Sequence, residues 1–168
     1  MDARPILLEI ARALRQQKLE VILIGNAAAA LQGAPVTTLD VDFLFRRTAL
    51  NLRKLKAAAR SLRAVVFAPY YPVSGMFRLV RDDDALQVDF MTKIHGARSF
   101  NSIRSRASTV DVGGERILVA SLSDIIGSKR AAGRSRDKAV LDVLETTLRE
   151  SQTGPASKKG SRSAGEGK

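Results

Sequence analysis

Apolar residues recur every three or four positions in several stretches of the chain, and this spacing predicts amphipathic helices. Pro5 stands at the start of the first stretch, where it suits the first turn of a helix. Ser121 followed by Asp124 is a typical helix start, and Gly133 is a typical helix end. Helices are therefore expected at residues 5–14, 26–32, 48–62, 121–133 and 135–149.

Short β-branched runs, and runs that alternate apolar with polar residues, predict strands between these helices. A turn at 82–84 separates two of the runs, and Gly113-Gly114 separates two others as in a β-hairpin. The strands are expected at residues 20–24, 39–45, 64–68, 76–81, 86–91, 108–112 and 116–119. Because helices and strands alternate, we expect an α/β (α+β) fold in which helices flank one mixed β-sheet.

The length of 168 residues is typical of one domain, which we expect to span residues 1–150. Residues 151–168 are rich in Ser, Gly and Lys and contain no large apolar residue, so we expect a disordered basic tail. The N-terminus lacks the layout of a secretory signal, no apolar run is long enough for a membrane helix, and cysteine is absent. These features predict a cytoplasmic protein with no membrane partner.

The charge balance is unusual for such a composition. Lys and Arg number 28 against 17 Asp and Glu, which gives a net charge of +11. A surplus of this size favours a polyanionic partner such as a nucleotide or RNA. An equally weighted alternative is that the surplus reflects an arginine-rich genome.

Two acids in the run at 39–45 carry the clearest chemical signal. Asp40 and Asp42 lie on one face of the predicted strand, while Val41, Phe43 and Phe45 lie on the other. Neighbouring carboxylates repel each other, and a divalent cation such as Mg²⁺ relieves that repulsion. Taken alone, two solvated acids on an exposed strand face explain the pattern as well.

The segment upstream of these acids runs from a buried strand through Gly25-Asn26 into a helix rich in alanine. Free backbone N–H groups at such a junction bind phosphate, and Gly25 allows close approach. The alternative is an ordinary tight turn in which Asn26 is the N-cap of the helix.

A third acid, Asp89, lies on the predicted strand at 86–91 opposite its apolar face. An acid among apolar residues in mid-strand requires a partner. If this strand pairs with the one that carries Asp40 and Asp42, the three carboxylates converge and can hold two Mg²⁺ ions for phosphoryl transfer.

The segment IGNAAAALQGAPVTTLDVDFLF resembles the signature of the DNA polymerase β-type nucleotidyltransferase superfamily: a strand, a Gly-Gly or Gly-Ser turn, a helix, and a strand with two spaced acids. Asp89 matches the third acid of that superfamily. The segment VASLSDIIGSKRAAGRSRDKAVLDVL is similar to the C-terminal helices of small bacterial members related to AbiE-type toxins and minimal nucleotidyltransferases. The resemblance covers residues 21–144.

The resemblance implies a nucleotidyltransferase-like sheet and a role for each motif. Gly25 and Asn26 would bind the triphosphate of an NTP, and Asp40 and Asp42 would bind Mg²⁺, with two ions expected. Asp89 would complete the metal site and help to deprotonate the attacking hydroxyl.

Three further positions follow from the same resemblance. Lys129 matches a helical lysine that faces the nucleotide phosphates, and Asp137 matches an acid that supports catalysis or pairs with Lys129 or a nearby Arg. Thr38 is expected to hydrogen-bond near the metal site. The chain departs from the pattern at Asn26, which replaces a Gly or Ser, and at Val36, where many relatives have Arg.

We therefore expect a Mg²⁺-dependent enzyme that transfers an NMP from an NTP to an acceptor hydroxyl. The acceptor is expected to be an RNA end such as that of tRNA, with a protein hydroxyl as the main competitor and a small antibiotic as a weaker one. The resemblance also implies a toxin–antitoxin role with an antitoxin partner. The alternative is a module of the same fold that binds nucleotide or RNA without catalysis.

Other candidate residues carry weaker signals. His95, the one histidine, is expected at the surface, and Tyr70 and Tyr71 are expected to anchor a loop rather than stack on a base. The basic stretch with Arg98, Arg104 and Arg106 suits either a nucleic-acid backbone or a solvated loop.

Overall fold

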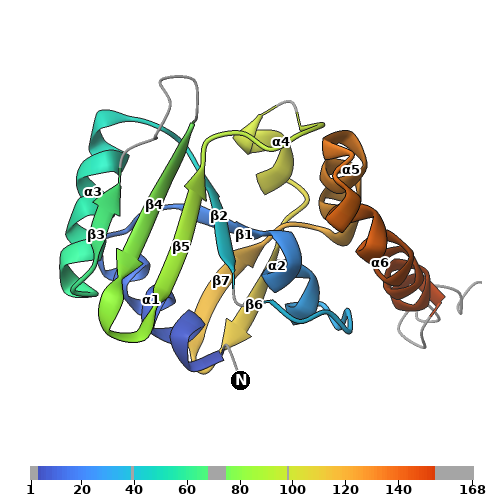
Figure 1. Ribbon diagram of the computed structural model, residues 1–168, viewed down its shortest axis with the longest axis horizontal. Coiled ribbons are helices and arrows are strands. Elements are labelled where there is room, and N and C mark those ends of the chain that lie inside the picture. The colour runs from blue at the N-terminus through green and yellow to red at the C-terminus, as the bar shows by residue number, and fades with distance from the viewer. Residues whose placement is uncertain (1–3, 39, 68–74, 98, 154–168) are drawn as a thin grey trace, which may run out of the picture.

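The computed structural model describes residues 4–38, 40–67, 75–97 and 99–153. Its centre is a seven-stranded mixed sheet with the strand order β3-β4-β5-β2-β1-β7-β6 (Figure 1). The strands are β1 (Val21–Ile24), β2 (Val41–Phe45), β3 (Val65–Phe67), β4 (Met76–Arg81), β5 (Leu86–Met91), β6 (Ser108–Val112) and β7 (Glu115–Val119). Every predicted strand is confirmed to within a few residues.

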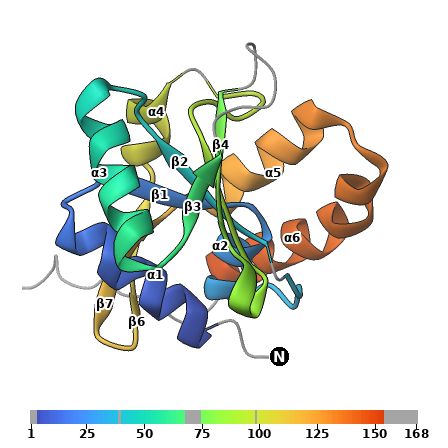
Figure 2. The same cartoon turned by 60° about the vertical axis from the view of Figure 1, so that its left-hand side comes forward.

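Helices flank the sheet on both sides. In Figure 2, α1 (Arg4–Gln16) and α3 (Ala49–Ser61) lie on one side, and α2 (Gly25–Leu31), α5 (Leu122–Ala132) and α6 (Ser135–Thr153) lie on the other. Each of the five expected helices is present, and the mixed, flanked sheet confirms the expected fold class. None of the helices in the described ranges has both the length and the apolar character that a bilayer-spanning segment needs.

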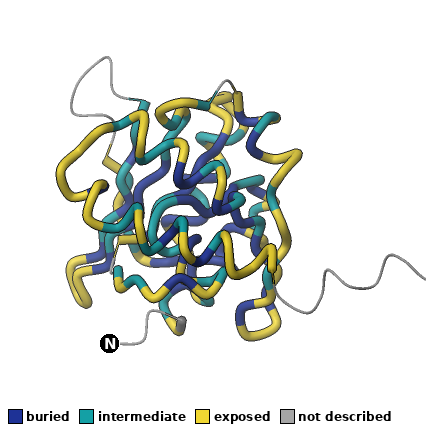
Figure 3. Tube along the Cα trace, turned by 90° about the vertical axis from the view of Figure 1, so that its right-hand side faces the viewer, coloured by how far each residue is buried: buried dark blue, intermediate teal, exposed yellow. Residues whose placement is uncertain are grey.

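The hydrophobic core lies between the sheet and its helices (Figure 3). Four phenylalanines of the central strands pack together: Phe43 stacks on Phe90, and Phe45 meets both Phe90 and Phe77 edge to face. These rings occupy alternate strand positions, as the sequence pattern predicts. The positions between them are therefore left to face the opposite side of the sheet.

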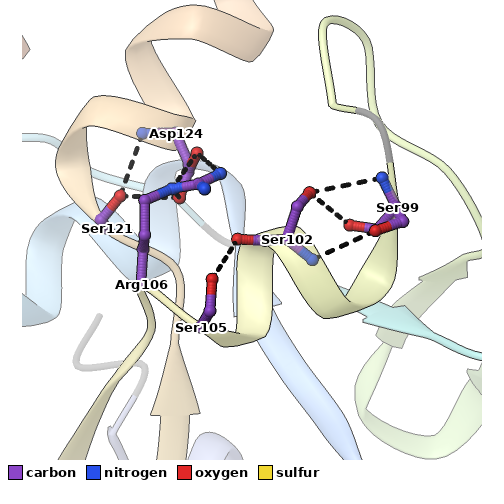
Figure 4. A network of polar contacts seen from close by, with 6 residues as sticks. All are labelled: Ser99, Ser102, Ser105, Arg106, Ser121 and Asp124. Atoms are coloured by element: carbon purple, nitrogen blue, oxygen red, sulfur yellow. Dashed lines mark hydrogen bonds and ion pairs between the residues drawn. The ribbon is translucent and has the colours of Figure 1, made fainter.

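Two parts of the chain differ from the expectations. A short helix, α4 (Phe100–Arg104), occupies a stretch expected to be a loop, and a reciprocal capping box between Ser99 and Ser102 starts it (Figure 4). Helix α6 continues to Thr153, so the first three residues of the expected tail are helical. The rest of that tail, Arg98, Tyr70 and Tyr71 lie outside the described residues.

Candidate active site

Strand register brings the predicted acids together. Strand β2 pairs in parallel with β5, and Asp42 is directly opposite Asp89. This is the pairing on which the convergence of the acids depended. On the other side of β2, Asp42 is opposite Ile24, the last residue of β1, so the turn at Gly25 begins beside it.

Asp40 stands just before β2 and is exposed. The Thr38 hydroxyl accepts a hydrogen bond from the backbone N–H of Asp40 (3.0 Å) and donates one to the Asp40 carbonyl (3.2 Å). Thr38 therefore fixes the backbone from which Asp40 projects, next to the site as expected.

Gly25 is required where it stands. Its φ of +70° is in the left-handed region, and a Cβ added at this position would lie 2.8 Å from Oδ2 of Asp42. Helix α2 begins at this residue, and its N-cap is Ile24 with no side-chain cap hydrogen bond. The alternative interpretation of Asn26 as an ordinary N-cap is therefore wrong.

Asp42 lines a cavity of about 280 Å³ to which two parts of the chain contribute. Residues 24–42 supply Gly25, Asn26, Thr38, Asp40 and Asp42. Residues 91–137 supply the cations Lys93, Lys129, Arg134 and Arg136, and also Asp137. Apart from Lys129, these cations were not predicted from the sequence, because Arg134 and Arg136 resemble solvated charges around a helix junction.

The environment of Asp42 opposes its ionisation. Burial first, and then the nearby carboxylates of Asp89 and Asp40, raise the pKa of Asp42 to about 6. Lys129 and Arg136 act in the opposite direction. The site therefore concentrates negative charge that a cation would stabilise.

On the side away from Asp42, Asp89 pairs with an arginine. Arg78 of β4 is directly opposite it in the sheet, and its Nε and Nη2 donate to Oδ1 and Oδ2 of Asp89 at 2.7 Å each. This bidentate pair occupies both carboxylate oxygens, and Asp89 is not among the residues that line the cavity. Arg78 was not identified from the sequence, although the hairpin that pairs residue 81 with 86 necessarily pairs 78 with 89.

Lys129 and Asp137 form a largely buried ion pair of 3.1 Å between α5 and α6. This is one of the two roles expected for Asp137. The pair holds Lys129 at the wall of the cavity and closes the junction between the two helices.

The residues present fit a hard divalent cation. Asp40 and Asp42 supply carboxylate oxygens, and Oδ1 of Asn26 is a buried oxygen without a hydrogen-bond partner. Mg²⁺ binds through one or two carboxylates together with substrate phosphates. Within the described ranges, no three His, Asp or Glu side chains form one metal-binding group. The two-ion arrangement with Asp89 therefore stays a prediction.

The remaining candidates lie at the edge of the site or away from it. His95 is exposed, as expected, and lines the cavity. Arg104 pairs with Glu20, and Arg106 makes a bidentate pair with Asp124 beside the α5 cap residue Ser121 (Figure 4). The loop expectation is wrong for Arg104, which lies in α4, whereas Arg106 lies in the turn after that helix. Both side chains are about half exposed, and a contact with a nucleic-acid backbone stays a prediction.

Comparisons with solved structures agree with this fold. ANT(2'')-Ia, an antibiotic-resistance factor, is similar with a TM-score of 0.64 at 15% identity, covering 88% of this chain and 86% of that one. The lincosamide antibiotic adenylyltransferase LnuA, solved with lincomycin, gives a TM-score of 0.61 at 12% identity, covering 84% of this chain and 95% of that one. TM1012 from Thermotoga maritima, described as a putative nucleotidyltransferase, gives a TM-score of 0.58 at 20% identity, covering 87% of this chain and 92% of that one. At these identities the similarity shows the fold alone.

No curated protein matches the chain. The model of a family described as "Nucleotidyl transferase of unknown function (DUF2204)" matches residues 3–160. This range includes every residue of the cavity wall and both strands that carry the acids. The chain therefore belongs to this family of nucleotidyl transferases, as the resemblance in its sequence implied.

Proposed function

We propose that the protein transfers an NMP from an NTP to an acceptor hydroxyl, with Mg²⁺ bound at Asp40 and Asp42. The observation that carries this proposal is that Asp40 and Asp42 share one cavity with Lys93, Arg134, Arg136 and the Lys129–Asp137 pair. A nucleoside triphosphate with its cation matches both kinds of charge at once. A phosphate alone would be repelled by the acids, and a metal alone would leave Lys93 and the two arginines without an anion.

The acids and the cations have separate tasks in this proposal. Asp40 and Asp42 would hold Mg²⁺, which supplies charge neutralisation at the α-phosphate when it is bound. Lys129, held in place by Asp137, and Arg136 are close enough to Asp42 to affect its pKa, so they are placed to bind phosphate oxygens. Lys93 and Arg134 line the same cavity.

The reaction is an in-line displacement. The acceptor oxygen forms a bond to the α-phosphorus, the bond from that phosphorus to the bridging oxygen breaks, and pyrophosphate leaves. The hydroxyl proton passes to a carboxylate, which we assign to Asp89 because it stands beside Asp42. The protein forms no covalent bond, so its contribution is positioning and electrostatic stabilisation.

We propose an RNA end, such as that of tRNA, as the acceptor. The net charge of +11 supports this choice, and a protein hydroxyl is its main competitor. A hydroxyl of a small antibiotic is a second candidate, favoured by the shared fold with LnuA and ANT(2'')-Ia. A toxin–antitoxin role with an antitoxin partner rests on the sequence resemblance alone.

The test is incorporation of label from each of the four α-³²P-labelled NTPs in the presence of Mg²⁺. Separate reactions contain total RNA, a protein extract, lincomycin or tobramycin. We expect label in one acceptor class, its loss in Asp42→Asn, and its retention in the control Arg116→Gln, which changes an exposed residue of β7. Tight NTP binding without incorporation in any reaction would overturn transfer and support a binding module.

A further inference from the structure

Four residues form a row across the sheet at the edge of the cavity. Arg78 of β4 is opposite Asp89 of β5, Asp89 is opposite Asp42 of β2, and Asp42 is opposite Ile24, which precedes the Gly25 turn. Asp89 thus stands between a guanidinium and a second carboxylate. A cation bound at Asp42 would approach Asp89 from the side away from Arg78.

The two carboxylates of this row are in different states. Asp42 is half-buried and lines the cavity with its charge poorly compensated, whereas Asp89 is buried and both of its oxygens are held by Arg78. A carboxylate engaged in a bidentate pair has its best lone pairs occupied. Asp89 in this arrangement is a weaker metal ligand and a weaker proton acceptor than a free carboxylate, because each oxygen has one lone pair left and the guanidinium withdraws its charge.

The Arg78–Asp89 pair is nevertheless accessible from one side. The side chain of Arg78 is 39% exposed, while that of Asp89 is 12% exposed. Arg78 also feels the charges of Asp40 and Asp42, which together with Asp89 raise the pKa of the guanidinium. The three acids therefore all attract the Arg78 guanidinium toward Asp89. A divalent cation bound to these acids would weaken that attraction.

We propose that Arg78 is the resting counter-ion of the third carboxylate and that a divalent cation with NTP displaces it from Asp89. This proposal rests on the transfer function proposed above and adds a positioning residue to it. In the resting protein, Arg78 neutralises Asp89 and competes with the metal. When the site is filled, Arg78 turns toward solvent and Asp89 becomes free to bind the cation or take the hydroxyl proton.

The first test measures Mn²⁺ binding without nucleotide, by calorimetry or electron paramagnetic resonance, so it does not depend on turnover. Arg78→Gln should bind Mn²⁺ at least about fivefold more tightly than the wild type, because the competing pair is gone. Arg78→Lys keeps the charge but loses the two parallel N–H donors of the guanidinium, so its affinity for Mn²⁺ should lie between those of the wild type and Arg78→Gln. Arg116→Gln removes the same charge far along the sheet and should match the wild type.

The outcomes separate this proposal from the proposed function. If Asp42→Asn abolishes Mn²⁺ binding while Arg78→Gln binds no more tightly than the wild type, the counter-ion role is wrong and the metal site stands. If Asp42→Asn leaves Mn²⁺ binding unchanged, both are wrong.

A second measurement uses the intact wild-type protein and avoids any loss of folding. The Nε–H resonance of Arg78, identified by its absence from the ¹⁵N spectrum of Arg78→Lys, should shift when Mg²⁺ and an ATP analogue with a methylene between the α- and β-phosphates are added. It should stay in place when Mg²⁺ is omitted. An unchanged resonance with both present would overturn the displacement.

Discussion

Two arginines of strand β4, three residues apart, lie on opposite faces of the sheet and pair with acids in different ways. Arg81 lies on the face covered by α1 and α3, where its side chain is only 8% exposed. It donates to Glu9 of α1, to Asp84 of the turn and to the carbonyl of Leu62 at the end of α3. Arg78, on the face that carries the site, donates to both oxygens of Asp89 and is 39% exposed.

One arginine therefore joins parts of the scaffold, whereas the other pairs with an acid of the proposed metal site. The acids that meet Arg81 come from separate elements and are themselves half exposed, so the guanidinium joins three parts of the scaffold. Asp89 instead stands next to another acid with a raised pKa. Its pairing with Arg78 offsets repulsion within the site, and a bound cation can take over that task.

The largest effect is expected at the covered face. Arg81→Met should lower the free energy of unfolding by about 2–4 kcal/mol, because it leaves a buried carbonyl and two acids without their donor. Urea denaturation measures this loss, and added Mn²⁺ should leave the difference from the wild type unchanged, because the ion stabilises both proteins equally through its own site. A loss as small as that of the control Arg116→Met would contradict the supporting role.

Gly25→Ala should cost about 2–3 kcal/mol, since it combines a left-handed backbone with a contact between Cβ and the Asp42 carboxylate. Transfer activity should fall with it, because Asp42 must move. Gly33→Ala is the matched control: its φ is +90° but nothing lies within 4 Å of an added Cβ. Equal losses of activity in the two variants would show that backbone strain, and not the displacement of Asp42, is the cause.

Asp42→Asn should stabilise the metal-free protein at pH 8 by about 1–2 kcal/mol while it abolishes transfer. The pKa of Asp42 is raised from 3.8 to about 6 in the folded state, so its ionised form destabilises the fold above pH 6. As the pH falls, the folded protein binds the proton at a higher pH than the unfolded chain does. The free-energy cost of the ionised Asp42 therefore disappears near pH 4. Denaturation curves at pH 8 and pH 4 test this, and an equal gain at both would show that ionisation of Asp42 is not the cause.

The smallest effect is expected at the pair between Arg106, whose side chain is 51% exposed, and Asp124. Arg106→Gln should lower the free energy of unfolding by only about 0.5 kcal/mol, because water solvates Arg106 and because Asp124 keeps the hydrogen bond from the Ser121 hydroxyl. Transfer to the identified acceptor, measured by label incorporation, should be unchanged. A large loss of transfer would place this arginine in acceptor binding and would weaken the contrast between the two β4 arginines.

Most elements of this fold could be predicted from the sequence because they bury an apolar face of the right period. Strand β3 is predicted by its β-branched run alone, since Val65 and Phe67 are exposed. Helix α4 was the exception: it spans only five residues, and its signal is limited to the capping pair Ser99 and Ser102. The acids could be predicted because Asp42 and Asp89 interrupt apolar strands. The other residues of the cavity could not be predicted, because their place depends on packing between distant parts of the chain. Arg134 and Arg136, for example, line the cavity because α5 and α6 meet beside it.

The predicted acids and the cations of the cavity come from successive parts of the chain, and this has a consequence for synthesis of the protein. The five neighbouring strands from β3 to β1 all come from residues 21–91, which also contain Asp40, Asp42 and Asp89. The cations that line the cavity begin at Lys93 and end at Arg136. A ribosome therefore releases these three acids before any of the cavity's own cations, and Arg78, made between the second and third acids, is the first of the arginines and lysines of the site to emerge.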